Sequence, residues 1–153
     1  MADGRILAFL SGAGRDGRGR RLDEVLAFDD RRLEAVHDYI QWLFPLPDAS
    51  RAVPDSPVLD DAEAAAIRTD ATARAGLRAA LARMSAFYRD TGGWLVPADH
   101  NHLRITRIIA ATRDLLGAAE ADAFHDLVIR RNAEAGSPVS KTSLLYWSRA
   151  LGR

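Results

Sequence analysis

The segment HNHLRITRIIAATRDLLG, residues His100–Gly117, has the hydrophobic spacing of an α-helix with one buried face. Its apolar residues and one threonine recur every three or four positions, as Ile105, Ile108, Ile109, Thr112, Leu115 and Leu116. Asp99 precedes the segment, and aspartate is a common N-cap residue. Gly117 follows it, as is frequent where a helix ends. The sequence therefore predicts a helix from Asp99 to about Gly117.

The same periodicity continues on both sides of this segment. Further helices are expected over about 22–28, 30–44, 60–68, 70–89, 119–135 and from Ser140 to the C-terminus, while 6–10 is a helix or a strand. Residues 11–21 form a loop rich in Gly and Arg, and residues 45–59 form a loop with four prolines, expected at the surface. The fold class predicted for 1–153 is all-α, as a single domain of about six or seven helices.

Composition excludes several classes of protein. The chain has 153 residues, of which 48% are hydrophobic, which is enough for a sizeable core. Its 21 basic and 21 acidic residues give a net charge of zero, so there is no strong signal for nucleic-acid binding. With no cysteine, disulfides, Cys-ligated metals and thiol nucleophiles are excluded. No apolar run approaches the roughly 20 residues of a membrane helix. We expect a cytoplasmic protein without a transmembrane segment.

The predicted helix 30–44 is apolar on nearly all sides, which is typical of a buried helix. His37, Asp38 and Gln41 are therefore expected among packed neighbours, where each needs a hydrogen-bond partner. The simpler interpretation is a central structural helix. The alternative is a recognition cleft lined by Asp38 and Trp42.

Two segments carry a resemblance to a known family. LEAVHDYIQWLFPLP (Leu33–Pro47) and HNHLRITRIIAATRDLLG (His100–Gly117) resemble the conserved domain of the opioid growth factor receptor. The preceding LDEVLAFDDRRLE is similar to bacterial members of that family. The resemblance implies an all-α domain without established enzymatic chemistry, whose animal members are described as nuclear receptors for an enkephalin pentapeptide. It implies a non-enzymatic binding or interaction module, with a peptide, a protein or a small molecule as partner.

The second motif places polar residues on or beside a buried stripe. Asn101 falls on the stripe, one turn before Ile105, while Arg104 and Arg107 flank it. The guanidinium of Arg104 suits a carboxylate such as Asp38, so the two motif helices are predicted to pack with these groups facing each other. This cluster either joins two helices or lines a pocket for a carboxylate. The candidate interaction residues are His37, Asp38, Gln41, Trp42, His100, Asn101, Arg104 and Arg107.

Other chemical signals are weak. Gly12–Gly17 formally matches G-x-G-x-x-G, but no further strands are predicted to build a dinucleotide-binding sheet. A flexible Arg-rich loop is expected there. His100 and His102 are two residues apart, so on a helix they diverge by about 200° and do not chelate a metal. There is no G-x-S-x-G and no serine with an obvious histidine partner. No catalytic residue, cofactor or metal is predicted.

Two functions remain open at this point. The preferred one is the binding module, which a shallow groove or a filled core would favour. The alternative is a small-molecule enzyme that uses His37, His100 and Arg104. A large enclosed pocket with converging His, Asp and Arg side chains would favour the enzyme.

Overall fold

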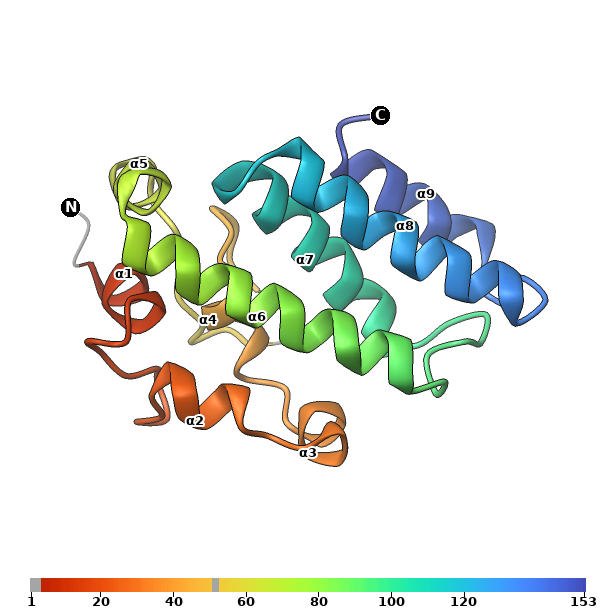
Figure 1. The fold of residues 1–153 in the computed structure, drawn as a ribbon, viewed down its shortest axis with the longest axis horizontal. Helices are drawn as coiled ribbons and strands as arrows, with labels where there is room; N and C mark the ends of the chain where they lie inside the picture. Colours follow the sequence, from red (N-terminus) through yellow and green to blue (C-terminus); the bar gives the residue numbers. More distant parts are fainter. Residues whose placement is uncertain (1–3, 51–52) are drawn as a thin grey trace. The chain divides into compact units, whose positions relative to one another are not determined.

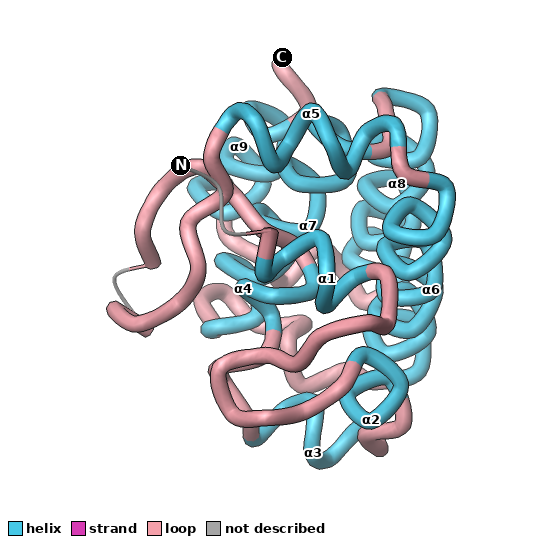
Figure 2. The backbone as a smooth tube through the Cα atoms, turned by 90° about the vertical axis from the view of Figure 1, so that its left-hand side faces the viewer, coloured by secondary structure: helices cyan, strands magenta, loops and turns pink. Residues whose placement is uncertain are grey.

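The computed structural model describes residues 4–50 and 53–153, and all regular structure within these ranges is helical (Figure 1; Figure 2). The described helices are α1 (Arg5–Leu10), α2 (Leu22–Leu26), α3 (Asp30–Ala35), α4 (Ile40–Leu43), α5 (Asp61–Thr69), α6 (Ala71–Asp90), α7 (His100–Leu115), α8 (Ala118–Glu134) and α9 (Lys141–Ala150). The all-α prediction is confirmed. The nine helices found in these ranges exceed the six or seven expected.

Helix starts follow local capping chemistry. Each of four cap side chains accepts a hydrogen bond from a backbone amide in the first turn of α3, α5, α7 or α9; these residues are Asp29, Asp60, Asp99 and Ser140. Asp70 does the same for α6, accepting from the amide of Ala73 at 2.8 Å. Such bonds engage the amides that a helix leaves without an internal partner. The predicted cap at Asp99 is therefore confirmed.

The continuous helix expected over 30–44 is wrong. Helix α3 ends at Val36, whose backbone is extended at φ −91° and ψ 134°, and α4 begins at Ile40. The Tyr39 hydroxyl donates to the carbonyl oxygen of Leu33 at 2.6 Å, and that carbonyl lies in the last turn of α3. A side chain thus binds a backbone carbonyl at the C-terminal end of α3. Residues 36–39 are therefore not helical, and side-chain hydrogen bonds such as that of Tyr39 take the place of helical backbone bonds there.

The chain forms two compact units, and the boundary between them falls within α6. Unit 1 comprises residues 1–80, and in its described part α1 packs against α4 and α5. Unit 2 comprises residues 81–153, and in it α7 packs against both α8 and α9, which run beside it in Figure 1. The expectation of a single domain stays a prediction.

Each unit buries its own set of apolar side chains. In unit 1 they include Ile6, Phe9, Leu10, Val25, Leu33, Tyr39, Leu43, Phe44, Ile67 and Leu77. In unit 2 they include Met84, Phe87, Tyr88, Trp94, Ile105, Ile108, Ile109, Phe124, Val128 and Trp147. The stripe predicted for α7 is largely among them, so the buried face of this helix was assigned correctly.

The proline-rich loop is only partly at the surface. Pro45, Pro57 and Leu59 are buried, and the Leu59 amide donates to the carbonyl oxygen of Leu46 at 2.9 Å. The two ends of the loop are therefore joined by a backbone hydrogen bond. Among the residues described, no helix has the length and apolar character needed to cross a membrane.

Candidate functional site

Two arginines of the Gly/Arg loop bind the carboxylate of Asp38. Arg18 Nε donates to Asp38 Oδ2 at 2.7 Å, and Arg20 Nη2 donates to Asp38 Oδ1 at 2.9 Å. Partial burial raises the pKa of Asp38, but the hydrogen bonds and charges of the two guanidinium groups outweigh this effect. The pKa is held below its usual value as a result. Asp38 therefore has the partners that its position was expected to require.

Asp16 gives the Gly/Arg loop its shape. Its side chain is completely buried; Oδ1 accepts from the backbone amides of Arg18 and Arg20, each at 2.9 Å. Oδ2 accepts from Arg20 Nε at 2.7 Å. Gly19 takes a positive φ of 76°, which closes the turn without the strain that a side chain would bring. Asp16–Arg20 is thus an ordered turn, and the flexible loop expected here is wrong for this part.

The break between α3 and α4 changes where the first motif places its polar groups. His37 is exposed, contrary to expectation, because it lies in the extended segment after α3. Gln41 and Trp42 are buried as predicted, and Gln41 Oε1 makes no hydrogen bond within the described residues. The indole of Trp42 packs edge-on against Phe9 with ring centroids 5.7 Å apart. With Trp42 inside the core, the cleft lined by Asp38 and Trp42 is not supported.

In the second motif Asn101 is completely buried and fully bonded. Tyr88 Oη donates to Asn101 Oδ1 at 3.0 Å, and Asn101 Nδ2 donates to Asp99 Oδ2 at 2.9 Å. The expectation that partners would hold a buried Asn101 is confirmed. These bonds connect α6 to the start of α7 within unit 2, so the role visible here is structural.

His102 is the residue that sequence reasoning missed. It is 4% exposed, and its Nε2 lies 2.8 Å from the carbonyl oxygen of Trp94 while its Nδ1 lies 2.9 Å from Ser143 Oγ. Because a carbonyl only accepts, Nε2 donates to the Trp94 carbonyl, and Nδ1 lies within hydrogen-bond distance of the Ser143 hydroxyl. Trp147 Nε1 donates to the His102 carbonyl at 3.0 Å. The structure thus pairs a histidine with a serine that sequence reasoning did not connect.

No sequence signal could have revealed this pair, because 41 residues separate its members. The other histidine of the motif, His100, is exposed, whereas His102 is buried. Arg104 is buried and Arg107 half-buried. The predicted pairing of Asp38 or Gln41 with Asn101 or Arg104 stays a prediction.

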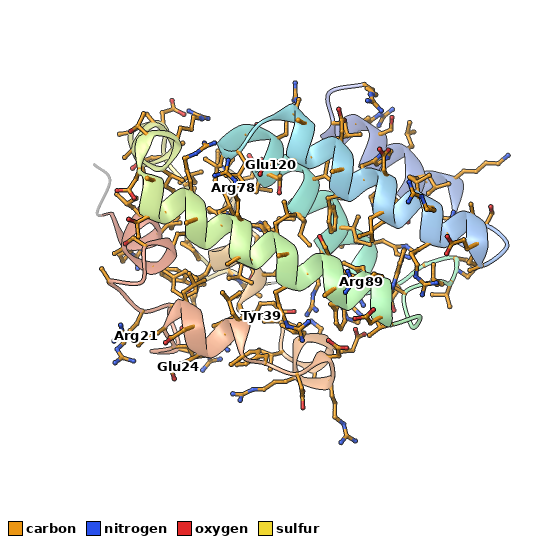
Figure 3. All side chains as sticks on the ribbon, in the orientation of Figure 1. Arg21, Glu24, Tyr39, Arg78, Arg89 and Glu120 are labelled. Carbon is orange, nitrogen blue, oxygen red and sulfur yellow. The ribbon has the colours of Figure 1, made fainter. Side chains whose placement is uncertain are left out.

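Each unit has an open hollow at its surface. The hollow in unit 1 has a volume of about 390 Å³ and lies between the end of α1, the start of α2 and the first turns of α6; it is lined by Leu10, Ser11, Gly12, Arg21, Leu22, Asp23, Leu26, Thr72, Ala75 and Gly76. Figure 3 labels Arg21 and Glu24 at this end of α2. Its floor is apolar and its rim is polar.

The hollow in unit 2 has a volume of about 530 Å³ and lies beside the end of α6, where Figure 3 labels Arg89. Its lining residues are Arg89, Ala123, Asp126, Leu127, Arg130, Arg131 and Glu134. Arg131 Nη2 donates to the carbonyl oxygen of Thr91 at 3.1 Å. Neither hollow is lined by a histidine within the described residues.

Comparison with known proteins gives one result. Residues 22–93 match the family model described as the opioid growth factor receptor (OGFr) conserved region. The match includes the motif Leu33–Pro47 and ends before the motif His100–Gly117. The chain matches no curated protein and no solved structure.

Proposed function

We propose that this chain, whose residues 22–93 carry the opioid growth factor receptor conserved region, is a non-enzymatic helical module that binds a peptide. The observation that carries the proposal is the open hollow of unit 1, whose apolar floor and polar rim suit a side chain flanked by backbone polar groups. Most of its lining, from Leu22 onward, belongs to the matched region. A peptide is the expected ligand rather than a specific opioid, because the match extends over the conserved region alone.

The hydrogen bonds of the candidate polar residues favour a binding function over a catalytic one. Asp38 is engaged by Arg18 and Arg20, and Asn101 is engaged by Tyr88 and Asp99. These groups hold the fold and are not presented to a substrate.

The alternative function, an enzyme, would need His37, His100 and Arg104 at one site, but these side chains differ in exposure. Arg104 is 6% exposed, whereas His37 and His100 are both exposed. A general acid–base site needs its members within hydrogen-bond reach of one substrate. This difference favours the binding module.

The test is a screen of short peptides by thermal shift, followed by titration of each hit against two matched variants. Leu26→Trp fills the unit 1 hollow, and Leu127→Trp fills the unit 2 hollow as a control. We expect hits to stabilise the parent and Leu127→Trp, and to lose at least about tenfold in affinity for Leu26→Trp. A stabilisation of about 2.7 kcal/mol is expected at 100 times the dissociation constant. Hits that bind Leu26→Trp equally well would place the site elsewhere, and turnover of a ligand would contradict the non-enzymatic reading.

A further inference from the structure

The outward face of α9 combines exposed apolar side chains with positive charge. Leu145 is 49% exposed and Tyr146 is 51% exposed. Lys141 and Arg149 lie four residues before and after Leu145, on the same side of the helix. Helix α9 contains no acidic residue, and neither cationic side chain forms an ion pair or hydrogen bond within the described part of the chain. This face is basic, partly apolar and unpartnered.

The combination of unpartnered cationic side chains and large exposed apolar side chains on one helix is unusual in this chain. Among the residues described, at least nine arginines bind a carboxylate, a carbonyl or an aromatic ring, as Arg20 binds Asp16, Asp38 and Phe28. Large exposed apolar residues are also few in the described ranges: Val58, Val96, Leu103, Leu145 and Tyr146. The coincidence of both features on one short helix indicates a contact surface.

A surface of opposite character exists in unit 1. The segment Val53–Asp61 reads VPDSPVLDD, with three aspartates and no basic residue. Its Val58 is 49% exposed, and Asp55 and Asp61 are exposed on either side of it. Neither of these two carboxylates forms a side-chain ion pair or hydrogen bond among the residues described. The exposed face of this segment is therefore acidic and partly apolar, with two carboxylates that have no partner among the described residues.

We propose that the protein forms a symmetric dimer in which the outward face of α9 from one copy binds the segment Val53–Asp61 of the other. In such a contact Leu145 and Tyr146 cover Val58, while Lys141 and Arg149 reach Asp55 and Asp61. Leu145 and Tyr146 of α9 and Val58 of the acidic segment are all exposed. A reciprocal arrangement buries both pairs of surfaces at once, and closed two-fold dimers are the commonest assemblies of identical chains.

The charges favour a second copy over other occupants. The formal net charge of the chain is zero, so two copies do not repel each other strongly at long range. The complementary partner of each surface is already present on the same polypeptide. An anionic lipid surface would match the charge of α9, but two half-exposed apolar side chains offer little area to insert.

The test measures the mass of the full chain by light scattering and sedimentation at low salt, from micromolar to about millimolar concentration. The parent is expected to dimerise, with a dissociation constant that rises about tenfold or more between 50 mM and 500 mM salt because exposed charges are screened. Lys141→Glu with Arg149→Glu, and separately Asp55→Lys with Asp61→Lys, should each give a monomer. Helical circular dichroism checks that both double variants fold.

The decisive experiment mixes the two double variants. Reversed α9 then faces a reversed acidic segment, and both native surfaces also meet, so an equimolar mixture should form the heterodimer. Arg130→Glu is the matched control, since Arg130 is exposed but lies on α8, and it should leave the dimer unchanged.

A parent that stays monomeric throughout the concentration range overturns the proposal. So does a dimer that resists both reversals, or a mixture that fails to associate. Binding of the monomer to vesicles with anionic lipid, lost in the α9 variant, would assign this face to a membrane instead.

Discussion

The carboxylate of Glu63 in α5 caps the first turn of α1 by accepting from the backbone amide of Ile6 at 2.9 Å. The same oxygen, Oε2, accepts from the amide of Leu7 at 3.0 Å, and Glu63 is only 4% exposed. The start of α5 is therefore not a reciprocal capping box. Asp60 caps the Glu63 amide, while the Glu63 side chain serves another helix.

Glu63→Ala should destabilise the protein by roughly 2–4 kcal/mol, because two buried amides lose a charged acceptor. Glu63→Gln keeps an oxygen in place and should cost about 1 kcal/mol. Urea denaturation measures both. Equal losses for the two variants would mean that the charge of the carboxylate sets the cost and that a neutral amide oxygen at this position does not replace it.

Gly76→Ala tests the approach of α6 to the end of α1. A Cβ atom at this position would collide with the backbone carbonyl of Leu10, and it would lie 3.0 Å from Leu22 Cδ2. Alanine gains up to about 1 kcal/mol of helix propensity over glycine. Overpacking against a backbone atom costs about 1–3 kcal/mol or more, so the clash should prevail.

The melting temperature of Gly76→Ala should therefore fall. Gly93→Ala is the matched control, because nothing lies within 4 Å of a Cβ there. A stabilised Gly76→Ala would show that α6 moves away from α1 at little cost.

Local chemistry explains what the sequence could predict. Caps such as Asp29, Asp99 and Ser140 lie within three residues of the amides that they bind. The hydrophobic stripe of α7 repeats over four turns, so its buried face was also predictable. Both signals are contained in a short window of sequence.

What the sequence missed depends on distant partners. The helix expected over 30–44 breaks near Asp38. The carboxylate of Asp38 accepts hydrogen bonds from Arg18 and Arg20, which lie 20 and 18 residues earlier in the chain. Arg131 binds a carbonyl 40 residues away, at Thr91. Tertiary contacts of this kind override helix propensity, and no periodicity records them. The candidate site was accordingly less predictable than the fold.

Asp38 should make stability depend on pH in the acid range. Its pKa is lower in the folded protein than the ordinary 3.8, so the folded state binds fewer protons there than the unfolded chain. The contribution is complete above about 3.8 and is lost as the pH falls through the folded pKa. Asp38→Asn should remove it, at a cost of roughly 1–2 kcal/mol at neutral pH.

The measurement is the free energy of unfolding between pH 7 and pH 2.5. The curve of Asp38→Asn should be flatter than that of the parent at the acid end, whereas Asp55→Asn, an exposed control, should follow the parent. Parallel curves for the parent and Asp38→Asn would contradict the role given to Arg18 and Arg20.

His125, on the half-buried side of α8, should act in a higher pH range. Burial lowers its pKa below 6.5, and the nearby charge of Arg153 acts in the same direction, although Asp126 and Asp122 oppose it. The folded state therefore disfavours the protonated ring. Stability should be complete above about pH 6.5 and decline as the pH falls below it. In His125→Gln this decline between pH 7 and pH 5 should be smaller; an unchanged decline would assign it to other groups.

His102 on α7 and Ser143 on α9 connect these two helices. Ser143→Ala removes the hydrogen-bond partner of a buried ring nitrogen and should cost about 1–2 kcal/mol. His102→Phe keeps a ring against Trp147 but loses the bonds to Ser143 and to the Trp94 carbonyl, so it should cost more. Urea denaturation measures the loss of unfolding free energy in each single variant and in the double variant. If the hydrogen bond acts as a structural link, the double variant should lose less than the sum of the two single losses, by at least about 0.5 kcal/mol. Strict additivity would mean that the two side chains only lie close together, and the contact between α7 and α9 would then rest on Trp147.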